Sequence, residues 1–352
     1  MHVPKSFRMK WGVVSVALGV LSAMTFVALP RAAPAPQDTP GASRPRGGAG
    51  SWTASRLPWG DPDLQGIWPS TEMFGVPFER PEHFGTRALL NDQEFAEREA
   101  QTAKQAQGDL EEFSAPRADL GGGVGPPGHW TERGRAARQA SLIIDPPNGR
   151  LPSMTPDGAR RAAAARSTYS PENLWTFNGP EDLGVYDRCI TRGVLRSTLP
   201  AGYNMGIQIV QAPGLIAIVY EMIHETRTIP LDGRPHSRIR SYMGDPRGRW
   251  EGDTLVIETT SFNGKVGASR NGHEHPMTEA LRLTERFTRI AEDTMRYEAT
   301  VDDPKTWMRP WTVSLPLRLD PSYGMHEYAC HEGNYAMRNI LSGARAAERL
   351  GR

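Results

Sequence analysis

The residue best suited to acid–base chemistry is a glutamate that interrupts an apolar pattern. In the run Leu281–Ile290, Glu285 falls on the same face as the apolar residues Leu281, Leu283 and Phe287, so it is predicted to point inward. A buried carboxylate is costly unless it is paired or hydrogen-bonded. Two interpretations follow. The glutamate forms a structural ion pair with an arginine across the sheet, or it acts as a general acid or base in a pocket.

A histidine is the second candidate. The run Leu215–Ile229 is predicted to be one central strand, and it contains Glu221 and His224. Residues three apart on a strand lie on opposite faces unless a bulge intervenes, which disfavours a metal site made by this pair. His224 alone could transfer protons, because an imidazole titrates near neutral pH. The alternative is a hydrogen-bonded core residue.

A connection rich in charge and glycine separates two of the predicted strands. It contains His236, Asp245, Arg247 and Trp250. Such connections form pockets at the mouths of barrels, but they also form tight turns with surface salt bridges of little energetic weight. In the first interpretation all four residues contact substrate, and Arg227, Arg247 or His236 holds an anionic or carbonyl group.

The segment His326–Tyr335 contains two histidines, two glutamates and two tyrosines. So many polar side chains at the end of a predicted strand are unusual for packing alone. His331 is a third candidate for catalysis, and Tyr328 is a candidate for contact with substrate. The sequence identifies no cofactor, and it leaves open whether a metal is bound.

The chain has two cysteines, Cys189 and Cys330. In an oxidising compartment two cysteines of one folded domain most simply form a disulfide. A loop of this size would stabilise the fold by about 4–5 kcal/mol on the chain-entropy model. Two alternatives stay open: a pair of free thiols, or a role for Cys330 as nucleophile or metal ligand beside His331.

The elements that must position these residues are strands. Apolar and polar residues alternate with a period of two along much of the second half, which is typical of strands with one buried face. About eight strands follow one another without intervening helices. This order predicts a mainly β domain over residues 201–352, an antiparallel meander closing into a barrel that is lipocalin-like in outline, with a closing C-terminal helix. The predicted strands are Met205–Gln211, Leu215–Ile229, Ser237–Met243, Thr254–Thr260, Leu281–Ile290, Met295–Val301, Trp311–Leu319 and one near His326–Glu332.

The first half divides into three parts. Residues 1–31 place Lys and Arg before an apolar run, which is typical of a secretory signal sequence, although the run is long enough to be an uncleaved N-terminal anchor. Residues 32–56 have the composition of a disordered linker. Residues 57–200 are predicted to form an extended and helical arm that packs on the β domain, with a helix over Asn91–Phe113 and another opened by Thr155.

The charge balance argues against nucleic acid as a partner. Lys and Arg number 41 and Asp and Glu number 40, so the formal net charge is only +1. Nucleic-acid binding normally requires a basic excess, because the neutralisation of phosphates supplies the affinity. The expected partner is a small molecule. Apart from a possible N-terminal anchor, no contact with a membrane is expected, and the location is periplasmic or secreted.

Three motifs resemble those of a large group of exported proteins from environmental bacteria. They are Ile229–His236 (IPLDGRPH), Gly248–Val256 (GRWEGDTLV) and Tyr328–Tyr335 (YACHEGNY). The resemblance spans about Asp61 to Gly343 and implies export and one shared domain. It implies no activity, cofactor or catalytic residue.

The leading functional hypothesis is an exported enzyme that performs hydrolysis, elimination or isomerisation on a small organic substrate in a β-barrel pocket. Glu285, His224 and His331 would carry the acid–base steps. The alternatives are a non-catalytic protein that binds a small ligand through the same residues, and a structural protein of the cell envelope.

Overall fold

The computed structural model describes residues 52–110, 128–165, 177–269 and 274–351. The predicted signal sequence or anchor (residues 1–31) and most of the predicted linker lie outside these ranges. The described residues all belong to one compact unit, Gly50–Arg352. Within them, no helix has both the length and the apolar character needed to cross a membrane.

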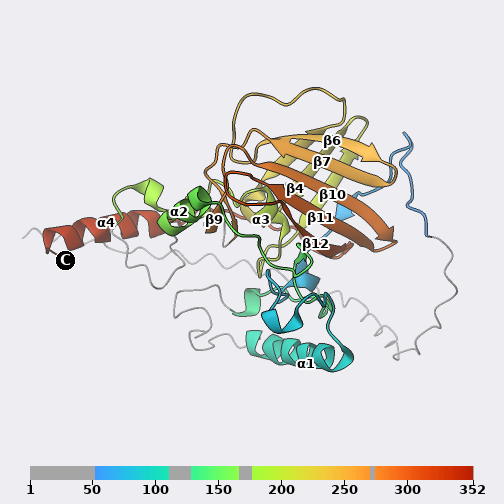
Figure 1. Cartoon of the computed structure of the whole chain (residues 1–352), viewed down its shortest axis with the longest axis horizontal. Helices are drawn as coiled ribbons and strands as arrows, with labels where there is room; N and C mark the ends of the chain where they lie inside the picture. The colour runs from blue at the N-terminus through green and yellow to red at the C-terminus, as the bar shows by residue number, and fades with distance from the viewer. Residues whose placement is uncertain (1–51, 111–127, 166–176, 270–273, 352) are drawn as a thin grey trace, which may run out of the picture. The chain divides into compact units, whose positions relative to one another are not determined.

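Two antiparallel sheets form the centre of the fold. The four-stranded sheet has the order β1-β3-β4-β5, and the six-stranded sheet has the order β2-β12-β11-β10-β7-β6. Figure 1 shows β12, β11, β10, β7 and β6 side by side. The smaller sheet consists of β1 (Gly66–Ile67), β3 (Ile207–Ala212), β4 (Leu215–Tyr220) and β5 (Thr226–Pro230). The larger consists of β2 (Ile143–Asp145), β6 (Asp245–Glu251), β7 (Thr254–Thr260), β10 (Arg282–Ala291), β11 (Thr294–Asp302) and β12 (Trp311–Arg318), and β8 (Gly267–Ser269) pairs separately with β9 (Glu274–Pro276).

The mainly β, antiparallel prediction is confirmed, but neither sheet of the described residues closes into a barrel. The facing edge strands β5 and β6 contact each other without forming a hydrogen-bonded ladder. Near the other edge, the backbone N–H of Asp320 donates to the carbonyl of Ile67 over 3.0 Å. The strand predicted at Ser237–Met243 is absent. That segment makes one isolated bridge, between Ser241 and Phe262, and adds no strand that could join the sheets.

One hydrophobic core receives side chains from both sheets. The alternation read from the sequence is confirmed on β10, β11 and β12, whose inward-facing residues are fully covered. This burial of apolar area is the main stabilising contribution to the fold. The largest buried side chains are Trp68, Trp311, Tyr220, Tyr297 and Phe287.

The run Leu215–Ile229 is a hairpin, so the prediction of one central strand was wrong. β4 and β5 pair with each other, and Ile216 lies opposite Ile229. Between them the chain turns at residues 221–225, where Ile223 and His224 have φ angles of 62° and 41°. This left-handed conformation is rare for a β-branched residue. Because the turn contains no Gly, Pro or Asn, its sequence carries no turn signal.

The first half of the chain contributes to both sheets. β1 pairs with β3, and β2 pairs with β12. Asn91 caps the predicted first helix in a capping box with Glu94, and Thr155 caps the second by accepting the N–H of Gly158. The α-helices are α1 (Asp92–Asp109), α2 (Pro156–Ala164), α3 (Val194–Thr198) and α4 (Ala336–Arg349). The 3₁₀ helices are η1 (Thr71–Met73), η2 (Glu82–Phe84), η4 (Gly128–Trp130), η5 (Pro180–Asp182) and η6 (Met222–His224).

Residues 320–335, between β12 and α4, form no strand, although one was predicted near His326–Glu332. We call this stretch the 320–335 segment. Side-chain hydrogen bonds and a disulfide hold it in place, rather than a backbone ladder. The C-terminal helix predicted after it is present as α4, although none of its residues is buried.

Candidate functional site

Glu285 lies in the core as one half of an ion pair between the two sheets. The Arg227 guanidinium of β5 donates to both of its carboxylate oxygens, over 3.1 Å and 2.6 Å. Neither side chain is more than 2 % exposed. The hydroxyl of Tyr297 also donates to Glu285, and Arg227 donates to Tyr220 and Thr259. Burial lowers the pKa of Arg227, but its charge interactions and hydrogen bonds with Glu285 and Tyr220 together outweigh burial, and the net shift is upward.

His224 lies away from this pair, on the hairpin turn between β4 and β5. Its side chain is exposed, not buried as predicted, because the chain reverses at residues 221–225. Its Nδ1 is 2.9 Å from the backbone carbonyl of Tyr328. In the described part of the chain, no hydrogen bond or ion pair joins His224 to Glu285. The structure therefore does not bring the two catalytic candidates together.

The predicted binding cluster around β6 is engaged with its own backbone. His236 Nδ1 lies 2.9 Å from the carbonyl of Asp245, and the Asp245 carboxylate accepts from Arg247 over 2.8 Å. Arg247 also donates to the carbonyl of Pro235. Trp250 is partly buried and packs against the core. These contacts are typical of the second interpretation, tight turns with surface salt bridges. Arg247 is engaged in them and does not point toward a ligand.

The 320–335 segment borders a groove of about 570 Å³, whose lining includes two of the residues singled out from the sequence. Tyr328 lines it, as does Cys330. His331 is exposed on the same segment but is not part of the lining. We call this groove of about 570 Å³ the tyrosine groove. Its lining consists of Trp130, Leu183, Tyr186, Asp187, Tyr203, Asn204, Glu327, Tyr328, Ala329, Cys330, Glu332, Gly333, Asn334, Ala336, Met337 and Ile340.

Three tyrosine hydroxyls meet in this groove. The hydroxyl oxygen of Tyr186 is 2.7 Å from that of Tyr328 and 3.1 Å from that of Tyr203. Burial raises the pKa of Tyr186, and it raises that of Tyr328 to about 12, so both are protonated at neutral pH. Two hydroxyl–hydroxyl bonds use two of the three protons. The third can go to the weak acceptor Met222 Sδ, 3.6 Å from Tyr186, or to a ligand.

The predicted disulfide between Cys189 and Cys330 is present, with the Cα atoms 5.6 Å apart. It connects the loop before α3 to the 320–335 segment. Beside it, the side-chain amide of Asn334 donates to the carbonyl of Asp187 over 3.1 Å. The disulfide therefore fixes one wall of the groove covalently.

Glu221 anchors the other end of the 320–335 segment, a role the sequence did not reveal. Its buried carboxylate accepts from the Asn204 amide, the backbone N–H of His326 and the Tyr323 hydroxyl, over 2.8, 3.0 and 2.7 Å. Tyr323 also lies 2.8 Å from a carboxylate oxygen of Glu132. The sequence separation of these residues hides the network. The only local signal was a glutamate in an otherwise apolar strand pattern.

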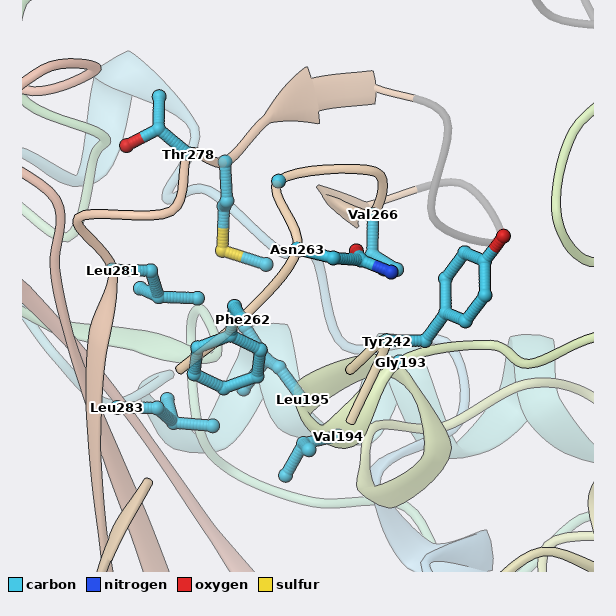
Figure 2. Close-up of a pocket in the computed structure, with 12 residues that line it drawn as sticks. Gly193, Val194, Leu195, Tyr242, Phe262, Asn263, Val266, Thr278, Leu281 and Leu283 are labelled. Carbon is cyan, nitrogen blue, oxygen red and sulfur yellow. The ribbon is translucent and has the colours of Figure 1, made fainter. Parts of the chain in front are cut away.

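A second hollow, which Figure 2 shows, is a packing crevice. The ring of Phe262 lies beside Leu195 and Leu283. A water-sized sphere finds only about 10 Å³ of space there, roughly the volume one water molecule requires. The crevice has no room for an organic ligand in this conformation.

A third hollow of about 520 Å³ runs along α1. Its charged side chains are already engaged. Arg98 donates to the carbonyls of Ala137 and Gln139, and Glu94 accepts from Arg87. The tyrosine groove is thus the better candidate site. Among the described residues, no group of three or more His, Cys, Asp or Glu side chains could hold a metal ion.

Comparisons with models of protein families, with curated proteins and with solved structures give no match to this chain. The resemblance of its three motifs to a group of exported proteins therefore stays a prediction.

Proposed function

We propose that this protein is exported and binds a small organic molecule in the tyrosine groove. This proposal rests on a hollow of about 570 Å³, at whose centre three tyrosine hydroxyls form a hydrogen-bonded chain. Ligand sites typically have volumes of about 300–1,000 Å³, with apolar and aromatic walls and a few converging polar groups. The groove fits this description, with Trp130, Leu183, Met337 and Ile340 as apolar or aromatic walls.

Export is supported by the disulfide, because such bonds persist in oxidising compartments. The basic and apolar N-terminal sequence supports it as well. Cell fractionation of the expressed full chain tests this part of the proposal. The protein is expected in the periplasm or the medium with its two cysteines oxidised. Recovery in the cytoplasm with free thiols would contradict export.

Binding rather than catalysis is the function that the geometry supports best. Glu285 has no exposed surface and is fully engaged with Arg227, while His224 is exposed at a different place. Tyr186 and Tyr328 of the groove have raised pKa values and are hydrogen-bond donors at neutral pH, which suits the orientation of a ligand. A binding protein requires no more than this.

A thermal-shift screen of small organic molecules, with each hit confirmed by calorimetry, tests binding. The matched variant is Ala329→Trp, which places a large ring in the groove from an exposed position. Ligands of the wild-type protein are expected to lose their effect in this variant. If the hits stabilise both proteins equally, the groove is not the site. If no molecule stabilises the wild type, the proposal fails.

Catalysis in the same groove is a second candidate, because linked hydroxyls can relay a proton. Mass spectrometry of a metabolite mixture incubated with the protein would detect a product. The control is Tyr328→Phe, which removes one end of the relay and keeps the ring. Formation of a product by the wild type and not by the variant would establish an enzyme. Ligand depletion without product would establish a binding protein.

A further inference from the structure

The lining of the tyrosine groove has an unusual balance of charge. It contains the three acidic residues Asp187, Glu327 and Glu332, and none of the described residues that line it is Lys, Arg or His. Glu327 and Glu332 are exposed, and neither side chain forms a hydrogen bond or ion pair with any described residue. Their charges therefore stay available to whatever enters the groove.

Two aromatic rings form a corner in the same lining. The ring centroids of Trp130 and Tyr203 are 6.3 Å apart, and the ring planes meet at 59°. Trp130 is 54 % exposed, so its ring is open to solvent. A cation is attracted to the face of such a ring when it lies within about 6 Å of the centroid, and Trp gives the strongest attraction. The exposed Trp130 ring therefore offers an aromatic surface to a cation in the lining.

Several basic groups lie near the groove without lining it, among them His331, between the lining residues Cys330 and Glu332, and His129, whose ring centroid is 6.4 Å from that of Trp130. Arg192 is buried behind Tyr186, with its guanidinium carbon 5.4 Å from the ring centroid. His224 contacts the backbone carbonyl of Tyr328. None of these basic side chains is part of the lining, whereas three carboxylate side chains are.

We infer that the ligand of the tyrosine groove is an organic cation, an amine or quaternary ammonium compound with an apolar part. This inference rests on the proposed binding function and names its ligand class. The cationic end lies in the corner of Trp130 and Tyr203, with Glu327 and Glu332 as the nearby negative charges. The linked hydroxyls of Tyr186, Tyr203 and Tyr328 donate a hydrogen bond to a polar group of the ligand. One of their three protons has no better acceptor among the described residues than the thioether sulfur of Met222.

The test is calorimetry with two probes of equal shape and different charge, choline and 3,3-dimethylbutan-1-ol. The wild-type protein is expected to bind choline about tenfold more tightly than the alcohol, the size that a partly desolvated cation–π contact gives. Added salt is expected to weaken the binding of choline more than that of the alcohol, because exposed charges are screened.

Two variants separate the contributions. Trp130→Leu is expected to weaken choline about 3- to 10-fold, and the double variant Glu327→Gln with Glu332→Gln by a similar factor, with little change for the alcohol. Matched controls outside the groove are Trp59→Leu and Glu99→Gln, two exposed positions that should leave both affinities unchanged. All the substitutions lie at exposed positions, so the fold is expected to persist.

The outcomes distinguish the two levels of the proposal. If the alcohol binds as tightly as choline and Ala329→Trp blocks both, the cation inference is wrong and the binding function stands. If choline affinity is unchanged in Trp130→Leu and in the double glutamine variant, the inference is wrong as well. If neither probe binds, the cation inference fails, and the Ala329→Trp comparison in the thermal-shift screen decides the binding function independently.

Discussion

Arg227 on β5 and Glu285 on β10 form a bidentate ion pair that connects the two sheets through the centre of the core. Each belongs to a different sheet. Arg227 also donates hydrogen bonds to Tyr220 and Thr259, and Glu285 also accepts one from the Tyr297 hydroxyl. Removing both charges from water is costly, so the pair depends on this complete set of partners. It lies where the buried faces of the two sheets meet.

Breaking this pair is expected to destabilise the protein strongly. Glu285→Gln should lower the free energy of unfolding by about 3–5 kcal/mol, because it leaves the Arg227 charge buried without a counter-charge. The double variant Arg227→Met with Glu285→Met should lose much less, since two apolar chains of similar length replace both charges. Guanidinium denaturation measures both. The exposed pair of Arg249 and Glu258 is the control, and Glu258→Gln should cost less than about 1 kcal/mol. If Glu285→Gln lowered the free energy of unfolding by less than about 1 kcal/mol, the structural role of the buried ion pair would be contradicted.

Reduction of the disulfide is expected to lower the free energy of unfolding by about 4–5 kcal/mol on the chain-entropy model, because 141 residues separate the two cysteines. Urea denaturation with and without reductant measures the loss. The double variant Cys189→Ser with Cys330→Ser should show a similar loss and no further response to reductant, since the chain has only two cysteines. Equal stability with and without reductant would show that the bond adds nothing.

Glu225 is expected to make stability depend on pH. Burial raises its pKa above the ordinary value of 4.5, partly offset by the hydroxyl of Thr191, 2.6 Å away. The folded state then binds the proton more tightly than the unfolded state. The resulting stabilisation is complete below pH 4.5 and is lost as the pH rises through the folded-state pKa. Glu225→Gln should therefore gain stability relative to the wild type between pH 4 and pH 7, as urea denaturation at each pH would show.

A control of opposite sign is available on β6. Hydrogen bonds from Arg286 and Arg249 lower the pKa of Glu251, so its favourable contribution is present at neutral pH and is lost as the pH falls. Glu251→Gln should thus lose stability relative to the wild type as the pH rises from 4 to 7. If both glutamine variants changed in the same direction, the assignment for Glu225 would be wrong.

Gly206 is expected to be intolerant of even a methyl group. A Cβ there would meet the Met325 sulfur, the Tyr323 ring at 2.6 Å and the Glu221 carboxylate at 2.7 Å. Gly206→Ala should cost about 1–3 kcal/mol by overpacking and should displace Tyr323 from Glu221. Gly343→Ala in α4 is the matched control. Its Cβ would meet no atom within 4 Å, so it should stabilise the protein by up to about 1 kcal/mol. Thermal denaturation compares the two, and equal effects would show that Gly206 has room.

The strands of the larger sheet could be read from the sequence because their pattern is local. β10, β11 and β12 each have one buried face and one partly exposed face, so alternation marks them directly. β7 is buried on both faces at Leu255, Val256 and Ile257, and its run of apolar residues marks it instead. β6 was missed because most of its residues are only partly buried and many are charged, which is typical of a connection. The turn at residues 221–225 was missed because it contains no Gly, Pro or Asn, and because the hydrogen bonds to the Glu221 side chain come from residues distant in the sequence.

The candidate site could be predicted only in part. The inward direction of Glu285 followed from its neighbours, but its partner Arg227 lies on another sheet, and no local pattern selects one arginine among many. Tyr328 was singled out by the density of polar residues around it. Its partners Tyr186 and Tyr203 come from distant loops, and only the folded chain shows that the three hydroxyls meet.

The two-residue strand β1 has a consequence for how far this chain can be shortened. It covers the outer edge of β3, a strand whose buried face carries Ile207 and Ile209. A shortened protein that began after Ile67 would expose backbone amides and carbonyls along that edge of β3. Such unpaired edges form hydrogen bonds with strands of other molecules. Versions trimmed for crystallisation should therefore begin upstream of Ala54, which is itself buried, if they are to stay monodisperse.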